Sequence, residues 1–95
     1  MISSHFPKPF VSVVIPALNE EATIAAVVLA VPREIADEVI VVDNGSVDLT
    51  AERARDSGAR VVREPRRGYG RACRGGVRVL APDCRIVVFL DGVRW

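Results

Sequence analysis

Three carboxylates stand directly after apolar segments of the chain, at Glu20, Asp43 and Asp91. Asp43 follows a run of four β-branched residues, 39–42, and is itself followed by Asn44-Gly45, which is typical of a turn. Carboxylates at such places accept hydrogen bonds from a base N–H or from ribose hydroxyls, or they ligate a hard cation. A purely structural role is the alternative for Asp43, because an Asp can cap a turn by accepting from backbone amides.

Bringing these acids together requires a sheet whose strands all end at one edge. The pattern predicts strands at 10–15, 38–43, 59–63 and 86–90, alternating with helices at about 20–31, 49–57 and 69–80. The apolar runs lack polar alternation, which favours a parallel sheet buried on both faces. The fold class is therefore α/β, an open parallel sheet of alternating β-α units with right-handed crossovers. With the strand order 3-2-1-4, a crevice opens between the first and fourth strands, and these acids would surround it.

Turn and cap chemistry predicts several local details. Pro16 is expected to end the first strand, because proline cannot donate to a ladder. Asn19 is expected to cap the first helix, whose Ala, Val and Leu content predicts that it is largely buried. Gly58 is expected to end the second helix in a left-handed conformation. The third strand is expected at a sheet edge, because Arg60 and Arg63 flank it.

The composition is that of one small globular domain, with 95 residues of which 49% are hydrophobic and 26% charged. A net charge of +1 gives no general attraction to polyanions. Seven arginines lie between positions 60 and 78, with Glu64 as the only acid among them. A solvated face is the favoured interpretation of this cluster. A nucleic-acid partner is not expected, because Tyr69 is the only aromatic residue there.

Cys73 and Cys84 lack the spacing of metal ligands, and we expect small buried side chains in a reducing, cytoplasmic compartment. The single histidine, His5, lies in an N-terminal tail of residues 1–9, so neither a histidine base nor a zinc site is expected. No segment has the pattern of a signal peptide or of a membrane span of about 20 residues. Peripheral association with a membrane is left open. Gly68-Tyr69-Gly70 does not complete a dinucleotide fingerprint, because Cys73 occupies the place of the third glycine.

Four segments in this order resemble the N-terminal half of the family 2 glycosyltransferases: VSVVIPALNEEATI, VIVVDNGSVDLT, GYGRACRGG and VVFLDG. The resemblance extends over roughly residues 10–92 and is nearest to the polyprenyl-phosphate and dolichyl-phosphate sugar transferases. It implies the GT-A fold, whose Rossmann-like half binds a nucleotide-sugar donor. Residues 10–95 would then form part of such a donor-binding domain.

The resemblance also implies roles for individual positions of this sequence, although no residue is assigned as catalytic. Asp91 would be the first acid of the family's DxD-type motif, near the ribose and a metal that is usually Mg²⁺ or Mn²⁺. Val93 stands where the second acid belongs, so we expect a weak metal site that rests on Asp91. The implied nucleotide-sugar contacts are Pro16, Leu18 and Glu20 in the nucleotide pocket, Val41 and Asp43 near the base, Asp91 and Gly92 near the ribose, and Gly68–Arg71 near the phosphates.

The family continues beyond the position at which this chain ends, Trp95, which suggests a truncated enzyme without its acceptor site and base. The alternatives are a non-catalytic nucleotide-binding or assembly module and an inactive fragment. The apolar fourth strand has no later segment to cover its far side, so we expect self-association through that edge. The resemblance also implies that full-length relatives can use a membrane lipid as the acceptor. The residues alone identify neither the base, nor the sugar, nor the acceptor.

Overall fold

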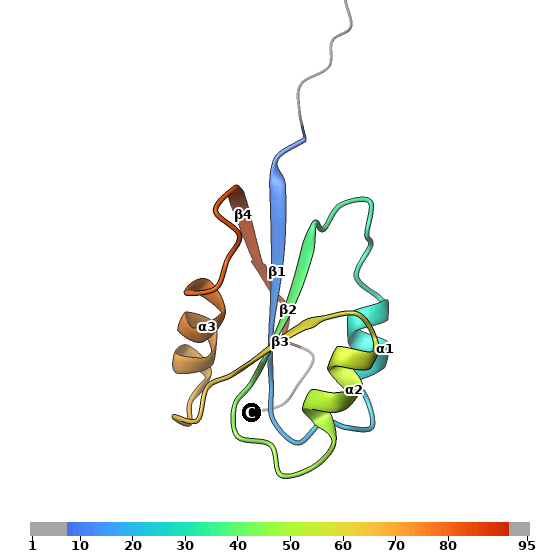
Figure 1. The fold of residues 1–95 in the computed structure, drawn as a ribbon, viewed down its shortest axis with the longest axis vertical. Helices are drawn as coiled ribbons and strands as arrows, with labels where there is room; N and C mark the ends of the chain where they lie inside the picture. The colour runs from blue at the N-terminus through green and yellow to red at the C-terminus, as the bar shows by residue number, and fades with distance from the viewer. Residues whose placement is uncertain (1–7, 92–95) are drawn as a thin grey trace, which may run out of the picture.

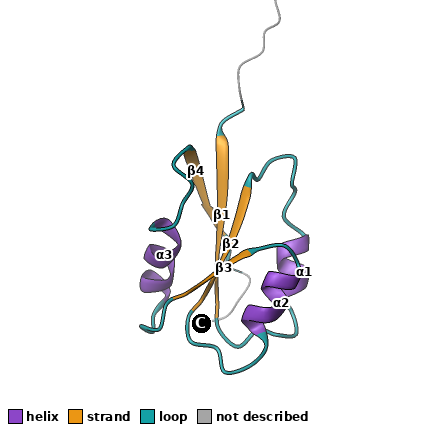
Figure 2. Ribbon diagram, viewed as in Figure 1, coloured by secondary structure: helices purple, strands orange, loops and turns teal. Residues whose placement is uncertain are grey.

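The computed structural model of the chain describes residues 8–91. Its elements are β1 (Phe10–Ala17), α1 (Ile24–Leu29), β2 (Glu38–Asp43), α2 (Thr50–Asp56), β3 (Arg60–Arg63), α3 (Tyr69–Val77) and β4 (Cys84–Phe89). The strands are all parallel, in the order β3-β2-β1-β4. One face of the sheet is covered by α3 and the other by α1 and α2 (Figure 1). Loops join each strand or helix to the next along the chain (Figure 2). The predicted fold class and strand order are confirmed.

The core consists of two apolar clusters, one on each face of β1 and β2. On the α1 side, alternate residues of both strands pack with Val28 of α1. On the α3 side, Val14, Ile40 and Val42 pack with Ala72 of α3. Full burial of such a Val or Ile side chain contributes roughly 1.5–3 kcal/mol. Because β1 and β2 are covered on both faces, their sequences are apolar without alternation.

β1 continues one residue past Pro16, so the expectation that this proline ends the strand is wrong. Val14 O accepts from Leu90 N at 3.0 Å, which shows that the even-numbered residues of β1 direct their peptide groups towards β4. The backbone nitrogen of Pro16 therefore also points towards β4. The last pairing of β1 with β4 is Val14 with Phe89, so the missing N–H of Pro16 removes no ladder hydrogen bond.

α1 is shorter and more exposed than the sequence predicts. Only Ile24 and Val28 of this helix are buried, and Leu29 is 70% exposed. Asn19 does not cap the helix, because it takes a left-handed φ of 52° and its Oδ1 accepts from Val47 N at 2.9 Å. A contact with a loop distant in sequence thus replaces the expected cap.

Gly58 has a φ of 101° immediately after α2, as predicted for a glycine that ends a helix. β3 forms one edge of the sheet, and its Arg60 and Arg63 are exposed, again as predicted. Cys73 and Cys84 are half-buried rather than buried. Cys84 is accessible because it begins β4, the outer strand on the opposite side from β3.

Some predicted features fall differently along the chain or outside the described residues. β4 begins earlier and α3 ends earlier than predicted. Most of the predicted tail and Gly92 are not among the described residues. No helix between residues 8 and 91 is long and apolar enough to cross a membrane.

α3 approaches the sheet closely at Gly76. A Cβ atom at this position would lie 2.4 Å from Val14 Cγ1 and 3.2 Å from Val42 Cγ2. Gly70, in the first turn of the same helix, has space around it, since the nearest atom to a Cβ there is Arg74 Nη1 at 3.9 Å. Glycine at position 76 is unfavourable for the helix, but it allows α3 to pack closely against β1 and β2.

We predict that Gly76→Ala lowers the free energy of unfolding by about 1–3 kcal/mol, the usual range for overpacking. Gly70→Ala is the matched control, and we expect it to leave stability unchanged or raise it by up to about 1 kcal/mol through helix propensity. Urea unfolding followed by circular dichroism measures both. A Gly76→Ala protein as stable as the wild type would contradict the close approach of α3 to β1.

Candidate functional site

The carboxyl ends of the four parallel strands lie at one edge of the sheet (Figure 1). The loop after β1 contains Leu18 to Glu21, the loop after β2 contains Asn44 to Leu49, and Asp91 follows β4. The order of the strands places the loop after β1 between the other two. Each of these segments therefore lies at the carboxyl edge of the sheet, where the sequence predicts a crevice.

Hydrogen bonds hold the loops after β1 and β2 against each other. Asn19 N donates to Ser46 Oγ at 2.9 Å, and Glu20 N donates to Thr50 Oγ1 at 2.7 Å. Thr50 is fully buried at the start of α2, so this hydroxyl is a fixed acceptor. These contacts position the backbone at Glu20 without using its carboxylate.

Glu20 has a carboxylate oxygen that lacks a partner. Its Oε2 is buried and accepts no hydrogen bond within the described part of the chain. Burial raises the pKa of Glu20 and the nearby Asp91 and Asp48 carboxylates raise it further, whereas a hydrogen bond from the Leu18 backbone lowers it. A buried acceptor left unsatisfied costs about 1–3 kcal/mol, which favours a ligand N–H or O–H at this oxygen.

Asp43 occupies the position of a turn cap. Its side chain is buried, Oδ1 accepts from Ser46 N at 2.9 Å, and Oδ2 lies 3.9 Å from Arg63 Nε. This is the purely structural role that the sequence left open for Asp43, in which its carboxylate caps the turn by accepting from a backbone amide. A contact of Asp43 with a nucleotide stays a prediction, as does the approach of Val41, whose side chain is buried in the core on the α1 side.

Asn44 is a residue that the sequence reasoning did not place in the site. Its side chain is fully buried, and Nδ2 donates to Glu64 O and to Arg66 O, both at 2.8 Å. Its Oδ1 accepts from Gly68 N at 3.1 Å. The amide therefore joins the end of β2 to the loop that leads into α3. The sequence signal, an Asn before a Gly, is also what a simple turn requires, so it did not single out this role.

Glu64 also holds the loop between β3 and α3, because its buried carboxylate binds Arg66 of that loop. Its Oε1 lies 3.1 Å from Arg66 Nη2 and 3.7 Å from Arg78 Nη1, and its side chain is 6% exposed. Hydrogen bonds from the Arg66 side chain and from the Arg66 backbone, with the charges of Arg66 and Arg78, lower the pKa of Glu64 to about 2. Part of the arginine cluster is thus paired around a buried carboxylate.

Tyr69 begins α3 and lies within electrostatic reach of Asp91 at this edge of the sheet. Burial raises the pKa of Tyr69, and the hydrogen bond with Cys73 and the charge of Asp91 raise it further. The charge of Asp91 also raises the pKa of Glu20. The structure therefore places Asp91 within electrostatic reach of both Glu20 and Tyr69, and it directs Asp43 towards Ser46 and Arg63.

The acids at this edge can hold a divalent cation only if a bound ligand supplies further coordinating atoms. Among residues 8–91, no group of three or more His, Cys, Asp or Glu side chains is placed to hold a metal. Mg²⁺ is usually held by one or two carboxylates plus substrate phosphates. Asp91, with Glu20 nearby, can supply carboxylates of that kind, and a diphosphate would supply the rest.

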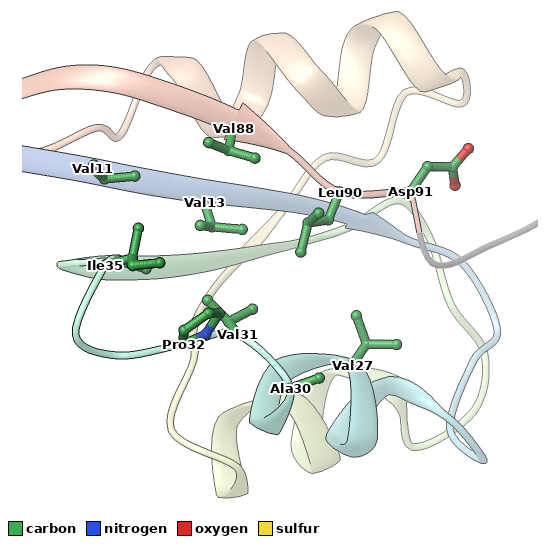
Figure 3. A pocket seen from close by; sticks show the side chains of 11 residues that line it. Val11, Val13, Val27, Ala30, Val31, Pro32, Ile35, Val88, Leu90 and Asp91 are labelled. Carbon is green, nitrogen blue, oxygen red and sulfur yellow. The ribbon is translucent and has the colours of Figure 1, made fainter.

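A separate cavity of about 500 Å³ lies between α1 and the face of β1 and β4 (Figure 3). Val27 and Val31 line it from the α1 side, and Val88 and Leu90 line it from the β4 side. Asp91 stands at its rim, and the other lining side chains are apolar. The cavity therefore lacks the donors and acceptors that recognise a nucleotide base.

Comparison with known proteins agrees with this geometry. The family model described as Glycosyl transferase family 2 matches residues 12–92. The chain belongs to this family. An uncharacterized glycosyltransferase of Mycobacterium bovis is 48% identical over 81 residues, covering 85% of this chain and 35% of that protein. A dolichyl-phosphate hexose transferase of Haloferax volcanii is 45% identical over 83 residues, covering 84% of this chain and 35% of that protein.

Solved structures of glucosyl-3-phosphoglycerate synthase from Mycobacterium tuberculosis match with a TM-score of 0.77 and 42% identity, covering 87% of this chain and 33% of that one. One contains Mn²⁺, uridine diphosphate (UDP) and glucosyl-3-phosphoglycerate, and another contains Mn²⁺, UDP-glucose and phosphoglyceric acid. The GT-A fold implied by the sequence motifs is confirmed. This glycosyltransferase-family chain spans about a third of the length of the relatives it matches.

We predict that Glu64→Gln is less stable than the wild type at neutral pH and that the difference narrows in acid. The folded-state pKa of Glu64, about 2, lies below the ordinary value of 4.5. The stability contributed by its carboxylate is therefore fully present above pH 4.5 and is lost as the pH falls towards 2. Thermal unfolding across this range measures the difference, with Glu52→Gln at an exposed position of α2 as the control. A difference that stays constant down to pH 2 would contradict the ion-paired loop.

Proposed function

We propose that this chain binds the nucleotide-sugar donor of a family 2 glycosyltransferase, and that the donor is a UDP sugar. The observation that carries the proposal is the buried, unpartnered Oε2 of Glu20, in the field of Asp91 at the carboxyl edge of β1 and β4. A nucleotide N–H or a ribose hydroxyl supplies the missing donor. The M. tuberculosis relative, whose structures contain UDP and UDP-glucose, supports uridine as the base.

The donor in this proposal lies along the crevice edge with its diphosphate towards the start of α3. Pro16, Leu18 and Glu20 contact the nucleoside, and Asp43 is on the base side. Asp91 and Gly92 are near the ribose and the diphosphate. Arg67 and Arg71 are exposed on either side of Gly68-Tyr69-Gly70, and their positive charge favours a diphosphate there. A bound Mg²⁺ or Mn²⁺ would supply Lewis-acid assistance to the departing nucleotide, held by Asp91 and the phosphates.

We infer that the acceptor bears a phosphate group. Transfer requires an acceptor held close to the donor, and a base when the acceptor is a hydroxyl. The Haloferax relative is named for dolichyl phosphate, and the M. tuberculosis relative contains phosphoglyceric acid. A lipid phosphate would bring the protein to a membrane surface, whereas a phosphoglycerate would not. The role assigned to the described residues is donor binding.

We predict that UDP and UDP-glucose raise the melting temperature of the chain and that GDP does not. Glu20→Gln should weaken UDP binding by about 1–3 kcal/mol, because the ligand donor loses a charged acceptor. Isothermal titration measures the affinity, with Glu34→Gln as the control, since Glu34 is exposed between α1 and β2. A folded wild-type chain that binds no UDP would reject the proposed function. Unchanged affinity in Glu20→Gln would remove Glu20 from the site.

We predict that Mn²⁺ strengthens UDP binding only weakly in the wild type and more strongly in Val93→Asp. The substitution restores an acid at the third position of the DxD-type motif, where a second carboxylate would share the cation with Asp91. Titration of UDP with and without Mn²⁺ measures the enhancement. Strong, saturable Mn²⁺ enhancement in the wild type would show that another acid is the ligand and that the alignment at Val93 is wrong.

A further inference from the structure

The loop after β1 is bonded to the loop after β2 through three consecutive backbone N–H groups, and both loops lie at the carboxyl edge of the sheet (Figure 1). Each N–H donates to a side-chain oxygen of the second loop or of the first residue of α2. The three pairs are Asn19 N with Ser46 Oγ at 2.9 Å, Glu20 N with Thr50 Oγ1 at 2.7 Å, and Glu21 N with Asp48 Oδ2 at 3.3 Å. The path of the chain at Glu20 is therefore determined by side chains that come from another part of the sequence.

The Asp48 carboxylate orients the hydroxyl of Thr50. Its Oδ1 accepts from Thr50 N at 3.0 Å and also from the Thr50 hydroxyl. The hydrogen bond from that hydroxyl lowers the pKa of Asp48, and bonds from the backbone of Thr50 and Glu21 lower it further, against the opposing effect of burial. An ionised carboxylate can only accept, so the one hydroxyl proton of Thr50 is directed at Asp48. A lone pair of the hydroxyl is then left to accept from Glu20 N.

Glu20 is also held at its other polar groups, with one exception. Its backbone O accepts from Thr23 N at 3.0 Å and from Ile24 N at 2.9 Å, where α1 begins. The Leu18 backbone donates to its carboxylate. The exception is Oε2, which is buried and accepts no hydrogen bond within the described part of the chain. The direction of Oε2 therefore depends on how the peptide groups on either side of Glu20 are held.

We propose that Thr50 and Asp48 are positioning residues of the donor site. Thr50 holds the N–H of Glu20, Asp48 orients the hydroxyl that does so, and neither side chain touches the nucleotide. The role rests on the proposed function, in which Glu20 Oε2 accepts from the nucleotide. Without the hydroxyl, the Glu20 N–H loses its acceptor and the loop has more conformations available. Nucleotide binding would then have to order the loop, which lowers the affinity.

A purely structural role for the same contacts leads to a different result. Leu49 N donates to Glu21 Oε2 at 3.1 Å, and Thr50 N donates to Asp48 Oδ1, so these acids also cap the start of α2. If capping were their whole role, breaking the contacts would lower the stability of the chain and leave the nucleotide affinity of the folded protein unchanged. Affinity and stability must therefore be measured separately.

The test compares Thr50→Val, which removes the hydroxyl at nearly constant volume, with Thr50→Ser, which keeps it. In isothermal titration of the full chain, we expect Thr50→Val to weaken UDP binding by about three- to tenfold and Thr50→Ser to keep most of the affinity. Hydrogen exchange at the Glu20 amide, measured without nucleotide, should become faster in Thr50→Val only. Ser57→Ala is the matched control and should change neither quantity, because it removes a hydroxyl that bonds Ala54 O at the end of α2.

Thr50 is fully buried, so circular dichroism checks that its variants fold, and Asp48→Asn at a half-buried position gives a second variant. The side-chain amide of Asn cannot accept from both Glu21 N and Thr50 as the carboxylate does, so we expect Asp48→Asn also to weaken UDP binding. A double-mutant cycle shows whether Thr50 acts through Glu20. In the Glu20→Gln background, Thr50→Val should change the UDP affinity by less than about twofold.

The outcomes distinguish this role from the proposed function. A folded wild-type chain that binds no UDP would overturn both. UDP binding that Thr50→Val and Asp48→Asn leave unchanged would overturn the positioning role alone. A loss in Thr50→Val that adds fully to the loss in Glu20→Gln, or a Glu20 amide that exchanges as slowly as in the wild type, would also overturn it and leave donor binding intact.

Discussion

The side-chain amide of Asn44 is the contact on which the arrangement of the loops at the carboxyl edge of the sheet depends. It is fully buried, and it bonds three backbone groups of the segment that links β3 to α3, at Glu64, Arg66 and Gly68. A buried amide with unpaired atoms would be costly, so these bonds determine the path of the segment strongly. Because Gly68 immediately precedes α3, the amide determines where Tyr69 and the helix begin.

A second constraint acts at the other end of α3. Gly76 lets the helix lie directly on Val14 of β1 and Val42 of β2. The helix is thus held at its start by a hydrogen-bonded amide and near its end by close packing. The loops after β1 and β2 are bonded to each other independently, through Asn19 and Ser46. Glu20 is therefore positioned through its backbone by rigid neighbours, which leaves its Oε2 available to a ligand.

Much of the fold could be predicted from the sequence because the strongest signals are local. The β-branched run of β2, the left-handed Gly58 and the charged edge strand β3 all appear where expected, and short parallel crossovers favour the neighbours β1-β2-β3. The position of β4 beside β1 was assumed and is confirmed by the structure. The predictions that failed concern residues whose conformation is determined by contacts distant in sequence. Pro16 is tolerated because β4 ends beside it, and Asn19 takes a loop partner instead of a helix cap. Neither fact is visible in neighbouring residues.

The candidate site was predictable to a similar degree. The acids after the strands could be recognised from their positions, and the family motifs supplied their implied roles. The contribution of Asn44 could not be recognised, because its partners lie about twenty residues further along the chain and are backbone atoms, which have no sequence signature. The environment of Glu20 likewise depends on how the strands are ordered in space.

The central claim is that the carboxyl edge of β1, β2 and β4, together with the start of α3, binds a nucleotide. The most direct measurement is the change in backbone amide ¹H–¹⁵N spectra when UDP is added to the chain. The account predicts shifts concentrated at residues 18–21, 44–46, 68–71 and 91, with α2 and the outer side of β3 unaffected. Shifts confined to those distant elements, or no shifts at saturating UDP, would contradict it.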